Sequence, residues 1–174
     1  MRRISVIGAS GSGKSTVARA MGAKLGLPVI HLDREFWQPG WVEPDTAAWR
    51  AHVAELVSRE AWVMDGDHGS LWDLRMPRTE AVVWLDRPRR IYFPRAVWRS
   101  IKGFGRTRPD MADDCPEQID RAFLFDWVWN YPTRSRATTA ARLAALGSEK
   151  RVVILRTNRE VAAFVARLPA TLSP

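Results

Sequence analysis

Near its start the chain reads Gly8-Ala9-Ser10-Gly11-Ser12-Gly13-Lys14-Ser15, a complete match to the pattern G-x-x-x-x-G-K-S/T. Its glycines let the backbone turn tightly and bring N–H groups close to phosphate oxygens. Lys14 can reach the β- and γ-phosphates, and the Ser15 hydroxyl can bind Mg²⁺. An apolar run precedes the motif and a helical pattern follows it, which is the context that a phosphate-binding loop needs. The residues expected to hold a nucleoside triphosphate are Gly8, Ser10, Gly11, Ser12, Gly13, Lys14, Ser15 and Thr16.

On either side of this loop, apolar runs alternate with helical patterns. The runs predicted as buried strands are 4–7, 28–32, 61–64, 81–85 and 151–155. The segments predicted as helices are 15–25, one that opens at 44–45, one from 116 through 129 that Pro132 closes, 136–146, and a last one around 161–168. This alternation predicts one α/β domain over residues 1–174, with a parallel sheet between two layers of helices.

The composition is that of an ordinary globular protein. The chain has 174 residues, of which 46% are hydrophobic and 26% charged, and this excludes disordered and collagen-like classes. No apolar run is long enough to span a bilayer, so we expect no membrane helix. The beginning of the chain looks like a strand rather than a secretory signal. Cys115 is the only cysteine and cannot form an internal disulfide, so we expect a reducing, cytoplasmic location.

The excess positive charge is concentrated in one segment. The net charge is +8, and residues 87–108 contain eight basic and no acidic residues, whereas the rest of the chain has 19 of each sign. Such a cluster suits a nucleic acid or a small polyphosphate equally well. The chain contains no helix-turn-helix, zinc-finger or RNA-binding signature. The sequence gives no indication of the oligomeric state.

Three predicted strands are followed by aspartates, Asp33, Asp65 and Asp86. Ligands of open α/β sheets bind at the carboxyl ends of the strands, so one of these carboxylates should orient Mg²⁺. For Asp86, which precedes Arg87-Pro88, a helix-capping role is the better interpretation. The chain lacks the base-reading and switch motifs of GTPases, and it is too short for a ring-forming ATPase. A small kinase remains.

Further motifs resemble those of the adenylate-kinase-like P-loop kinases of nucleotides and small molecules. Asp65-Gly66 resembles the Mg²⁺ site of that family, and Leu85-Asp86-Arg87-Pro88 resembles its turn after the fourth strand. Arg95 and Arg99 follow at the spacing of the two arginines at the base of the lid. The resemblance implies ATP and Mg²⁺ as cofactors, the strand order 2-3-1-4-5, a metal site at Ser15 and Asp65, and transition-state roles for Lys14, Arg95 and Arg99.

A closer resemblance is to a bacterial subgroup labelled "DNA topology modulation protein". The motifs that carry it are His31-Leu32-Asp33, Trp37-x-Pro39-Gly40-Trp41, Asp65-Gly66, Arg106-x-Arg108-Pro109-Asp110-Met111 and Cys115-Pro116-Glu117. By this resemblance, residues 102–115 form a short lid on which Arg106 and Arg108 close over phosphates. Thr157 lies where the family holds adenine.

The chain departs from adenylate kinases after Asp65-Gly66. It continues with Asp67-His68-Gly69, so it lacks the arginine that holds the acceptor monophosphate in that family. We therefore expect an acceptor other than AMP. The residues expected around the acceptor are Asp33, Trp37, Asp65 and Arg75. Asp33 would hold or deprotonate the acceptor hydroxyl.

The sequence thus predicts a kinase that moves the γ-phosphoryl group of ATP·Mg²⁺ to a small acceptor, either a nucleotide or a hydroxylated metabolite. Two alternatives stay open. Arg75 or Arg78 could replace the missing arginine, which would make the protein an adenylate or nucleoside monophosphate kinase. Alternatively, the chain is an NTP-dependent regulator that binds nucleic acid through residues 87–108.

Overall fold

A five-stranded parallel sheet forms the centre of the molecule, with the strand order β2-β3-β1-β4-β5. The computed structural model describes residues 1–169. The strands are β1 (Arg3–Gly8), β2 (Val29–His31), β3 (Trp62–Asp65), β4 (Ala81–Leu85) and β5 (Arg151–Ile154). All five predicted strands and their order are confirmed. The last residues of the predicted domain, 170–174, lie outside the described part of the chain.

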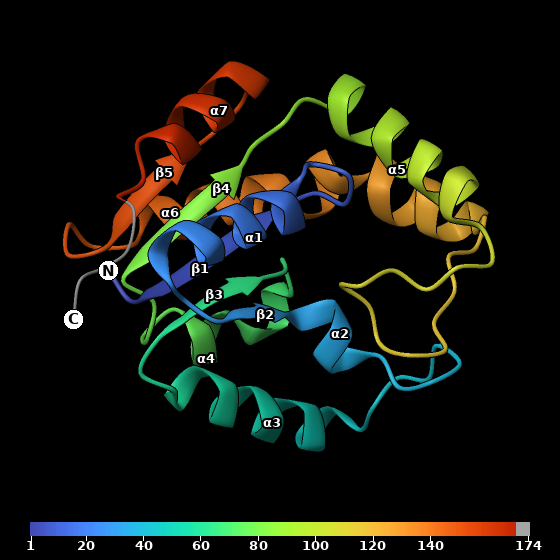
Figure 1. The fold of residues 1–174 in the computed structure, drawn as a ribbon, viewed down its shortest axis with the longest axis horizontal. Coiled ribbons are helices and arrows are strands. Elements are labelled where there is room, and N and C mark those ends of the chain that lie inside the picture. The colour runs from blue at the N-terminus through green and yellow to red at the C-terminus, as the bar shows by residue number, and fades with distance from the viewer. Residues whose placement is uncertain (170–174) are drawn as a thin grey trace.

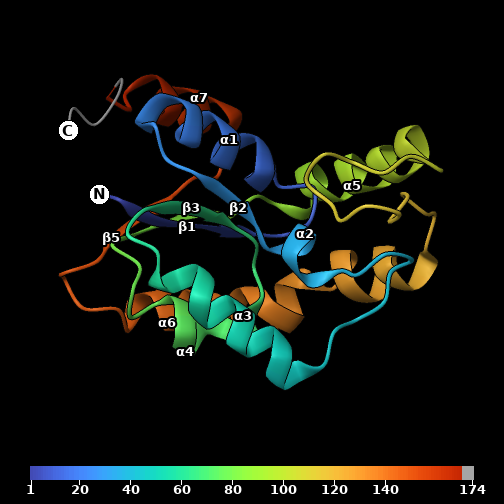
Figure 2. The same cartoon turned by 60° about the horizontal axis from the view of Figure 1, so that its bottom comes forward.

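Helices cover both faces of the sheet, as the alternating pattern predicts (Figures 1 and 2). The α-helices are α1 (Lys14–Leu25), α2 (Leu32–Phe36), α3 (Thr46–Ser58), α4 (Trp72–Arg75), α5 (Arg89–Gly103), α6 (Ala137–Ala144) and α7 (Asn158–Ala166). Helices α1 and α7 lie on one face, whereas α3, α4 and α6 lie on the other (Figure 2). Short helical turns add η1 (Gly69–Leu71), η2 (Phe123–Trp129) and η3 (Pro132–Arg136).

The three central strands are almost entirely buried, because helices cover both of their faces. Ile4 and Val6 of β1 face α1, which contributes Val17 and Met21 to the same cluster. On the other face, Met64 packs in a second cluster with residues of α3. Strand β5 lies at an edge and stays partly exposed.

One predicted helix, from 116 through 129, is wrong at its start, whereas the segment η2 ends at Trp129 as predicted. Pro116 and Glu117 pair with the preceding loop, since Glu117 N donates to Arg106 O at 3.0 Å, so they cannot begin a helix. Helical structure begins at 121, where Asp120 Oδ1 accepts from Ala122 N at 2.8 Å.

Pro132 does not close this helix. It stands at the first residue of η3, where its missing N–H removes no essential hydrogen bond. Helical structure continues through the π-helical segments η2 and η3, and η3 leads directly into α6.

The topology places the phosphate-binding loop at the centre of the carboxyl edge of the sheet. Strand β1 pairs with β3 on one side and with β4 on the other, so the loop after it meets the ends of both neighbours. Residues between α5 and η2 return over this edge as a long irregular segment, which Figure 1 shows in yellow. None of the helices within residues 1–169 combines the length and hydrophobicity needed to cross a bilayer.

Candidate active site

The phosphate-binding loop is held between β1 and α1 in a conformation that only glycines adopt without strain. Gly11 has a φ of +79°, and a Cβ there would lie 2.2 Å from the carbonyl oxygen of Tyr92 in α5. Gly13 precedes α1 in the left-handed region. The loop N–H groups and the amino end of α1 therefore form a concave surface suited to an anion. Lys14 reaches back over the loop, with Nζ donating to Ala9 O at 3.2 Å.

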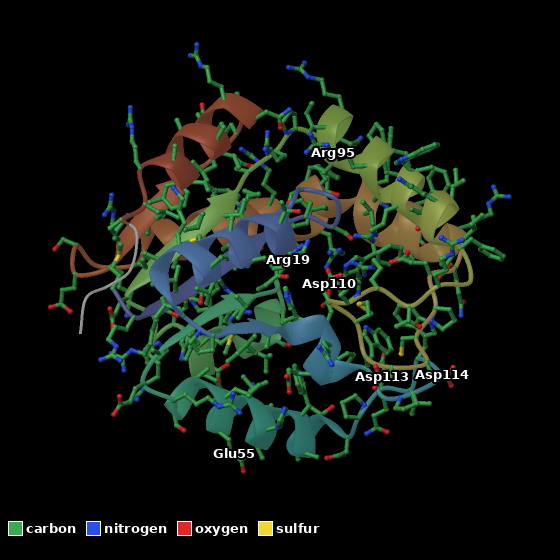
Figure 3. The ribbon with its side chains drawn as sticks, in the orientation of Figure 1. Arg19, Glu55, Arg95, Asp110, Asp113 and Asp114 are labelled. Atoms are coloured by element: carbon green, nitrogen blue, oxygen red, sulfur yellow. The ribbon has the colours of Figure 1, made fainter. Side chains whose placement is uncertain are left out.

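Arg95 and Arg99, for which the resemblance implies the same role, contact different parts of the protein. Arg99 Nη2 donates to Ser10 Oγ in the phosphate-binding loop at 3.1 Å. Arg95 lies one turn earlier in α5 and donates instead to Asn158 Oδ1 at 3.2 Å, next to Thr157. Figure 3 shows Arg95 away from the centre of the molecule. The Thr157 hydroxyl caps α7 by accepting from Glu160 N. Arg99 thus contacts the phosphate-binding loop, whereas Arg95 lies beside Thr157, the residue expected near adenine.

A cavity of about 1300 Å³ opens from the phosphate-binding loop towards α2, α3 and the segment η2–η3. Its loop side includes Ser10, Lys14 and Arg99, and its far side includes Asp33 and Trp37. One continuous space therefore connects the expected phosphate site with two of the residues expected around the acceptor.

Asp33 stands on the first turn of α2 and accepts a hydrogen bond from His68 Nε2 at 3.0 Å. The Asp33 side chain is 52% exposed. Partial desolvation acts to raise the pKa of Asp33, but the hydrogen bond and the positive charges of His68, Lys14 and Arg108 together lower it to about 2. Asp33 is therefore an ionised hydrogen-bond acceptor facing the cavity. A carboxylate with so low a pKa is a weak general base, so orienting a hydroxyl is the role that its chemistry favours.

Aromatic side chains line the wall of the cavity next to Asp33. Trp37 packs edge-on against both Phe36 and Trp41, at centroid distances of 4.9 and 5.2 Å. Trp49 of α3 continues this cluster by packing against Phe36. All four rings line the cavity, so they offer flat apolar surface to a bound molecule.

The lining of the cavity also includes two arginines that the sequence did not single out, Arg134 of η3 and Arg142 of α6. Arg134 lies over the ring of Trp127, and Arg142 donates to Gly69 O at 2.9 Å. Burial lowers the pKa of Arg134, while the nearby Asp67 carboxylate opposes this shift. Their positions depend on the π-helical path after residue 122, which the sequence pattern did not reveal.

Two other arginines do not reach the cavity lining. Arg75, expected near the acceptor, is 1% exposed and donates to Gly66 O at 3.0 Å and to Asp67 O. Burial lowers its pKa to about 10, although Asp67 and Asp65 oppose the shift. Arg78 donates to Ser58 O at 3.2 Å. Arg75 thus contacts the residues directly after Asp65, but neither its side chain nor that of Arg78 lines the cavity.

The predicted metal residues lie in a larger polar cluster. Asp65 at the end of β3 accepts from His31 Nδ1 at 2.8 Å through Oδ2, while its buried Oδ1 has no hydrogen-bond partner among the described residues. Asp110 of the predicted lid joins these two groups. Burial acts to raise the pKa of Asp110, but Arg108 and a hydrogen bond with Ser15 lower it. Ser15, Asp65 and Asp110 thus provide oxygens that fit a divalent cation beside the loop.

The predicted lid is tied down by ion pairs. Buried Glu117 pairs with Arg108 and, at 3.5 Å, with Arg99, and Arg108 also pairs with Asp110 at 3.0 Å. Arg106 is exposed and does not line the cavity. In this structure Glu117 therefore forms ion pairs with Arg99 and Arg108, two of the arginines expected to bind phosphates.

Asp86 does not cap a helix, contrary to the interpretation from sequence. Its two carboxylate oxygens accept from Arg136 at 2.6 and 2.8 Å, and Arg156 pairs with it at 3.3 Å. The next helix, α5, begins after Pro88 without a side-chain cap. Asp86 therefore links β4 to the segment that carries Arg134.

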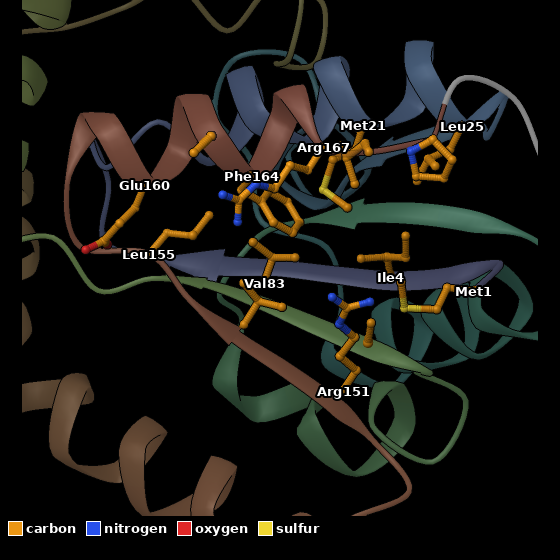
Figure 4. Close-up of a pocket in the computed structure, with 15 residues that line it drawn as sticks. Met1, Ile4, Met21, Leu25, Val83, Arg151, Leu155, Glu160, Phe164 and Arg167 are labelled. Atoms are coloured by element: carbon orange, nitrogen blue, oxygen red, sulfur yellow. The ribbon is translucent and has the colours of Figure 1, made fainter.

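A second cavity, of about 560 Å³, lies between strands β1, β4 and β5 and helices α1 and α7 (Figure 4). Met21, Leu25, Val83 and Phe164 give it a mostly apolar lining. It is remote from the phosphate-binding loop, so it is not the candidate active site.

The comparisons with known proteins identify the fold. The scan against protein-family models gave no match, and the search of curated proteins gave none either. A shikimate kinase from Acinetobacter baumannii in complex with shikimate has a TM-score of 0.62 and 17% identity, over 96% of this chain and 90% of that chain. A gluconokinase from Sinorhizobium meliloti 1021 has a TM-score of 0.51 and 23% identity, over 96% and 93%. The chain has the fold of the P-loop kinases.

A third similar structure is the deoxyadenosine kinase from M. mycoides with bound dCTP. Its TM-score is 0.50 at 13% identity, and the match covers 95% of this chain and 98% of that chain. The matched parts of these kinases span almost the same length as the present chain.

Proposed function

We propose that the protein transfers the γ-phosphoryl group of ATP to a hydroxyl group of a small acceptor. The observation that carries this proposal is the single cavity in which the phosphate-binding loop and an ionised carboxylate, Asp33, face the same space. Phosphoryl transfer between bound partners needs close positioning, neutralisation of charge and exclusion of water rather than a covalent intermediate. The P-loop kinase fold supports the same function.

Each residue then has a defined task. The loop N–H groups and Lys14 bind the phosphate oxygens, and Arg99, held on Ser10, neutralises the charge on the group in transfer. Asp33 accepts a hydrogen bond from the acceptor hydroxyl and fixes its direction of attack. Ser15 and Asp65 would hold a divalent cation, which neutralises charge on the phosphate oxygens when it is bound.

The lining of the cavity favours a flat or cyclic acceptor that bears hydroxyl groups. The aromatic wall formed by Trp37 and its neighbours suits the face of a ring, while Asp33 suits a hydroxyl. Arg134 and Arg142 add positive charge to the lining of the cavity, so an acceptor with a carboxylate also fits. These arginines weaken the electrostatic argument against AMP, although neither lies directly after Asp65-Gly66 as in adenylate kinases.

The position of the basic segment weighs against nucleic acid as the principal ligand. Three of the eight basic residues are withdrawn from the outer surface, since Arg87 is buried and Arg99 and Arg108 face the cavity. A titration of DNA binding against salt, with and without ATP, tests this alternative. Tight binding with a steep salt dependence that ATP does not change would favour a nucleic-acid function.

An ADP-release screen tests the proposed function. The acceptors are nucleoside monophosphates, sugars and hydroxylated carboxylates, each assayed with ATP and Mg²⁺. We expect at least one hydroxylated acceptor to stimulate ADP release, with the stimulation lost in Lys14→Ala and in Asp33→Asn. The matched control, Asp113→Asn, changes an exposed carboxylate and should leave the stimulation intact. Stimulation by AMP alone would restore adenylate kinase as the function.

A further inference from the structure

Three potential metal ligands from distant parts of the chain meet beneath the lid. His31 ends β2, Asp65 ends β3, and Asp110 belongs to the irregular segment between α5 and η2. One donor atom of each lies within 4.8 Å of the donor atoms of the other two. The three side chains are between 6% and 12% exposed. Figure 3 shows Asp110 near the centre of the molecule, whereas Asp113 and Asp114 lie towards its periphery.

The unpartnered oxygen of Asp65 is an independent indication of a ligand. Asp65 is 5% exposed, and its Oδ1 has no hydrogen-bond partner in the described structure, although His31 binds Oδ2. A buried carboxylate oxygen without a partner is costly, so such an atom is a natural place for a cation. Arg75 lies near enough for its charge to interact with Asp65. Its Nη1 donates to the carbonyl groups of Gly66 and Asp67, while its buried Nε and Nη2 have no hydrogen-bond partner among the described residues.

The types of ligand determine which cation suits the cluster. Mg²⁺ binds oxygen ligands almost exclusively and gives up its water reluctantly. An imidazole nitrogen beside two carboxylates suits divalent ions of the first transition series better, because these ions also accept nitrogen ligands. We propose that His31, Asp65 and Asp110 bind one such ion and that the site prefers Mn²⁺ to Mg²⁺. This proposal deepens the proposed function and rests on it, since the ion lies beside the phosphate-binding loop.

The site also connects the lid to the sheet. Asp110 follows Arg108, whose ion pairs with Glu117 and Asp110 hold the same segment over the cavity. An ion bound by Asp110 and by the two strand-end residues joins the lid to β2 and β3. Metal binding should therefore order the lid even without nucleotide.

Electron paramagnetic resonance of Mn²⁺, titrated into the full chain without nucleotide, tests the site directly. We expect one bound Mn²⁺ per chain, displaced only by a large excess of Mg²⁺. Loss of an outer-shell partner already weakens metal binding by roughly 10–100-fold, so Asp110→Asn should weaken Mn²⁺ binding by at least that much. His31→Gln replaces nitrogen by an amide oxygen, and it should lower the preference for Mn²⁺ over Mg²⁺. Asp65→Asn removes the ligand at the end of β3 and should also weaken Mn²⁺ binding. It tests the site independently of the lid if Asp110→Asn folds poorly.

Two matched controls separate the site from general charge effects. Asp113→Asn removes an exposed carboxylate from the same lid, and His52→Gln removes a histidine that pairs with Glu35 outside the cluster. Both variants should bind Mn²⁺ as the unmodified chain does. The proposal is overturned if the chain binds no Mn²⁺, if Asp110→Asn and His31→Gln bind it unchanged, or if Mg²⁺ competes equally well.

The assay distinguishes this proposal from the proposed function, because it uses neither ATP nor an acceptor. Normal acceptor-dependent ADP release with Mg²⁺, combined with unchanged Mn²⁺ binding in Asp110→Asn, contradicts the metal site alone. Specific Mn²⁺ binding without acceptor-dependent ADP release contradicts the kinase function alone.

Discussion

Asp33 and Asp67 line the same cavity, yet their pKa values move in opposite directions. Burial raises the pKa of Asp67, and the charges of Lys14, Arg75 and Arg134 only partly oppose this shift. At Asp33 burial acts in the same sense, but the hydrogen bond from His68 and the surrounding positive charges outweigh it. The surroundings of Asp33 therefore favour its ionised form, whereas burial disfavours the ionised form of Asp67.

The pKa of Asp33 is measurable by ¹³C NMR of the side-chain carboxyl group. We expect a midpoint of about 2, below the ordinary value of 3.8, and a rise towards 3.8 in His68→Gln. Because the folded-state pKa is the lower one, Asp33 stabilises the fold above pH 3.8, and this contribution is lost as the pH falls towards 2. His52→Gln should leave the midpoint unchanged. A midpoint near 3.8 in the unmodified chain would refute the assignment.

Arg99 and Arg95 should differ in the kinetic parameter that they control. Arg99→Lys keeps the charge but loses the planar fork held on Ser10. A charge-assisted hydrogen bond is worth about 1.5–3 kcal/mol, so kcat should fall roughly 10–100-fold if this contact acts in the transition state. Arg95→Lys, whose contact is Asn158, should mainly raise the KM for ATP. Steady-state kinetics measures both, and equal losses of kcat would contradict the separation.

At the scale of single residues, the sequence predicts only what local pattern determines. The phosphate-binding loop is a local motif, so its residues could be assigned directly. Arg75 is close in sequence to Asp65-Gly66, but the short helix α4 directs its side chain into the protein interior. Arg134 and Arg142 reach the cavity from distant segments, and Asp110 meets His31 through the return of the lid. No periodicity reports such long-range contacts.

At the scale of elements, the approach of α5 to the phosphate-binding loop fixes the shape of the loop. The carbonyl oxygen of Tyr92 occupies the space that a side chain at Gly11 would need. Gly40 has a similar φ of +78°, but a Cβ there would meet nothing within 4 Å. Alanine substitutions at these two glycines therefore distinguish the free-energy cost of a steric clash from the cost of an unfavourable φ.

Gly11→Ala should destabilise the protein more than Gly40→Ala. A left-handed φ costs a non-glycine residue about 1–2 kcal/mol, and this cost applies to both variants. Overpacking adds typically 1–3 kcal/mol, and this cost applies to Gly11→Ala alone. Urea denaturation measures the free energy of unfolding of each variant. Equal destabilisation would show that α5 does not constrain the loop.

The strands could be predicted because each is a short apolar run that becomes buried on both faces. The π-helical segments η2 and η3 could not be predicted from the sequence. A π-helix has no distinct hydrophobic periodicity, and proline is commonly a signal that a helix stops. Pro132 is tolerated there because it begins a new helical segment. Helix boundaries near the lid depend on tertiary pairing, as the contact of Glu117 with Arg106 shows.

At the scale of the whole molecule, the irregular segment over the cavity is the element most suited to move. Residues 104–120 contain no regular helix or strand, and ion pairs through Glu117 and Arg108 hold much of the segment. Phosphate oxygens compete with Glu117 for the same arginines. Nucleotide binding should therefore replace the ion pairs of Arg99 and Arg108 with Glu117 by contacts of these arginines with phosphate.

Hydrogen–deuterium exchange tests this behaviour of the lid, residues 102–115. A non-hydrolysable ATP analogue with a divalent cation should slow amide exchange in this segment, because lid closure excludes water. The amides of β4 serve as an internal control, since this strand is already buried. Unchanged exchange in residues 102–115 with nucleotide bound would contradict a mobile lid.

Transfer of the labelled γ-phosphoryl group of ATP to a hydroxylated small molecule is the most direct test of the central claim. The measurement follows the label by mass spectrometry in a pool of sugars, hydroxylated carboxylates and nucleosides. We predict a phosphorylated acceptor with the unmodified chain and with Asp113→Asn, and none above background with Lys14→Ala or Asp33→Asn. Label found only in inorganic phosphate, or equal transfer by all four proteins, would contradict the claim.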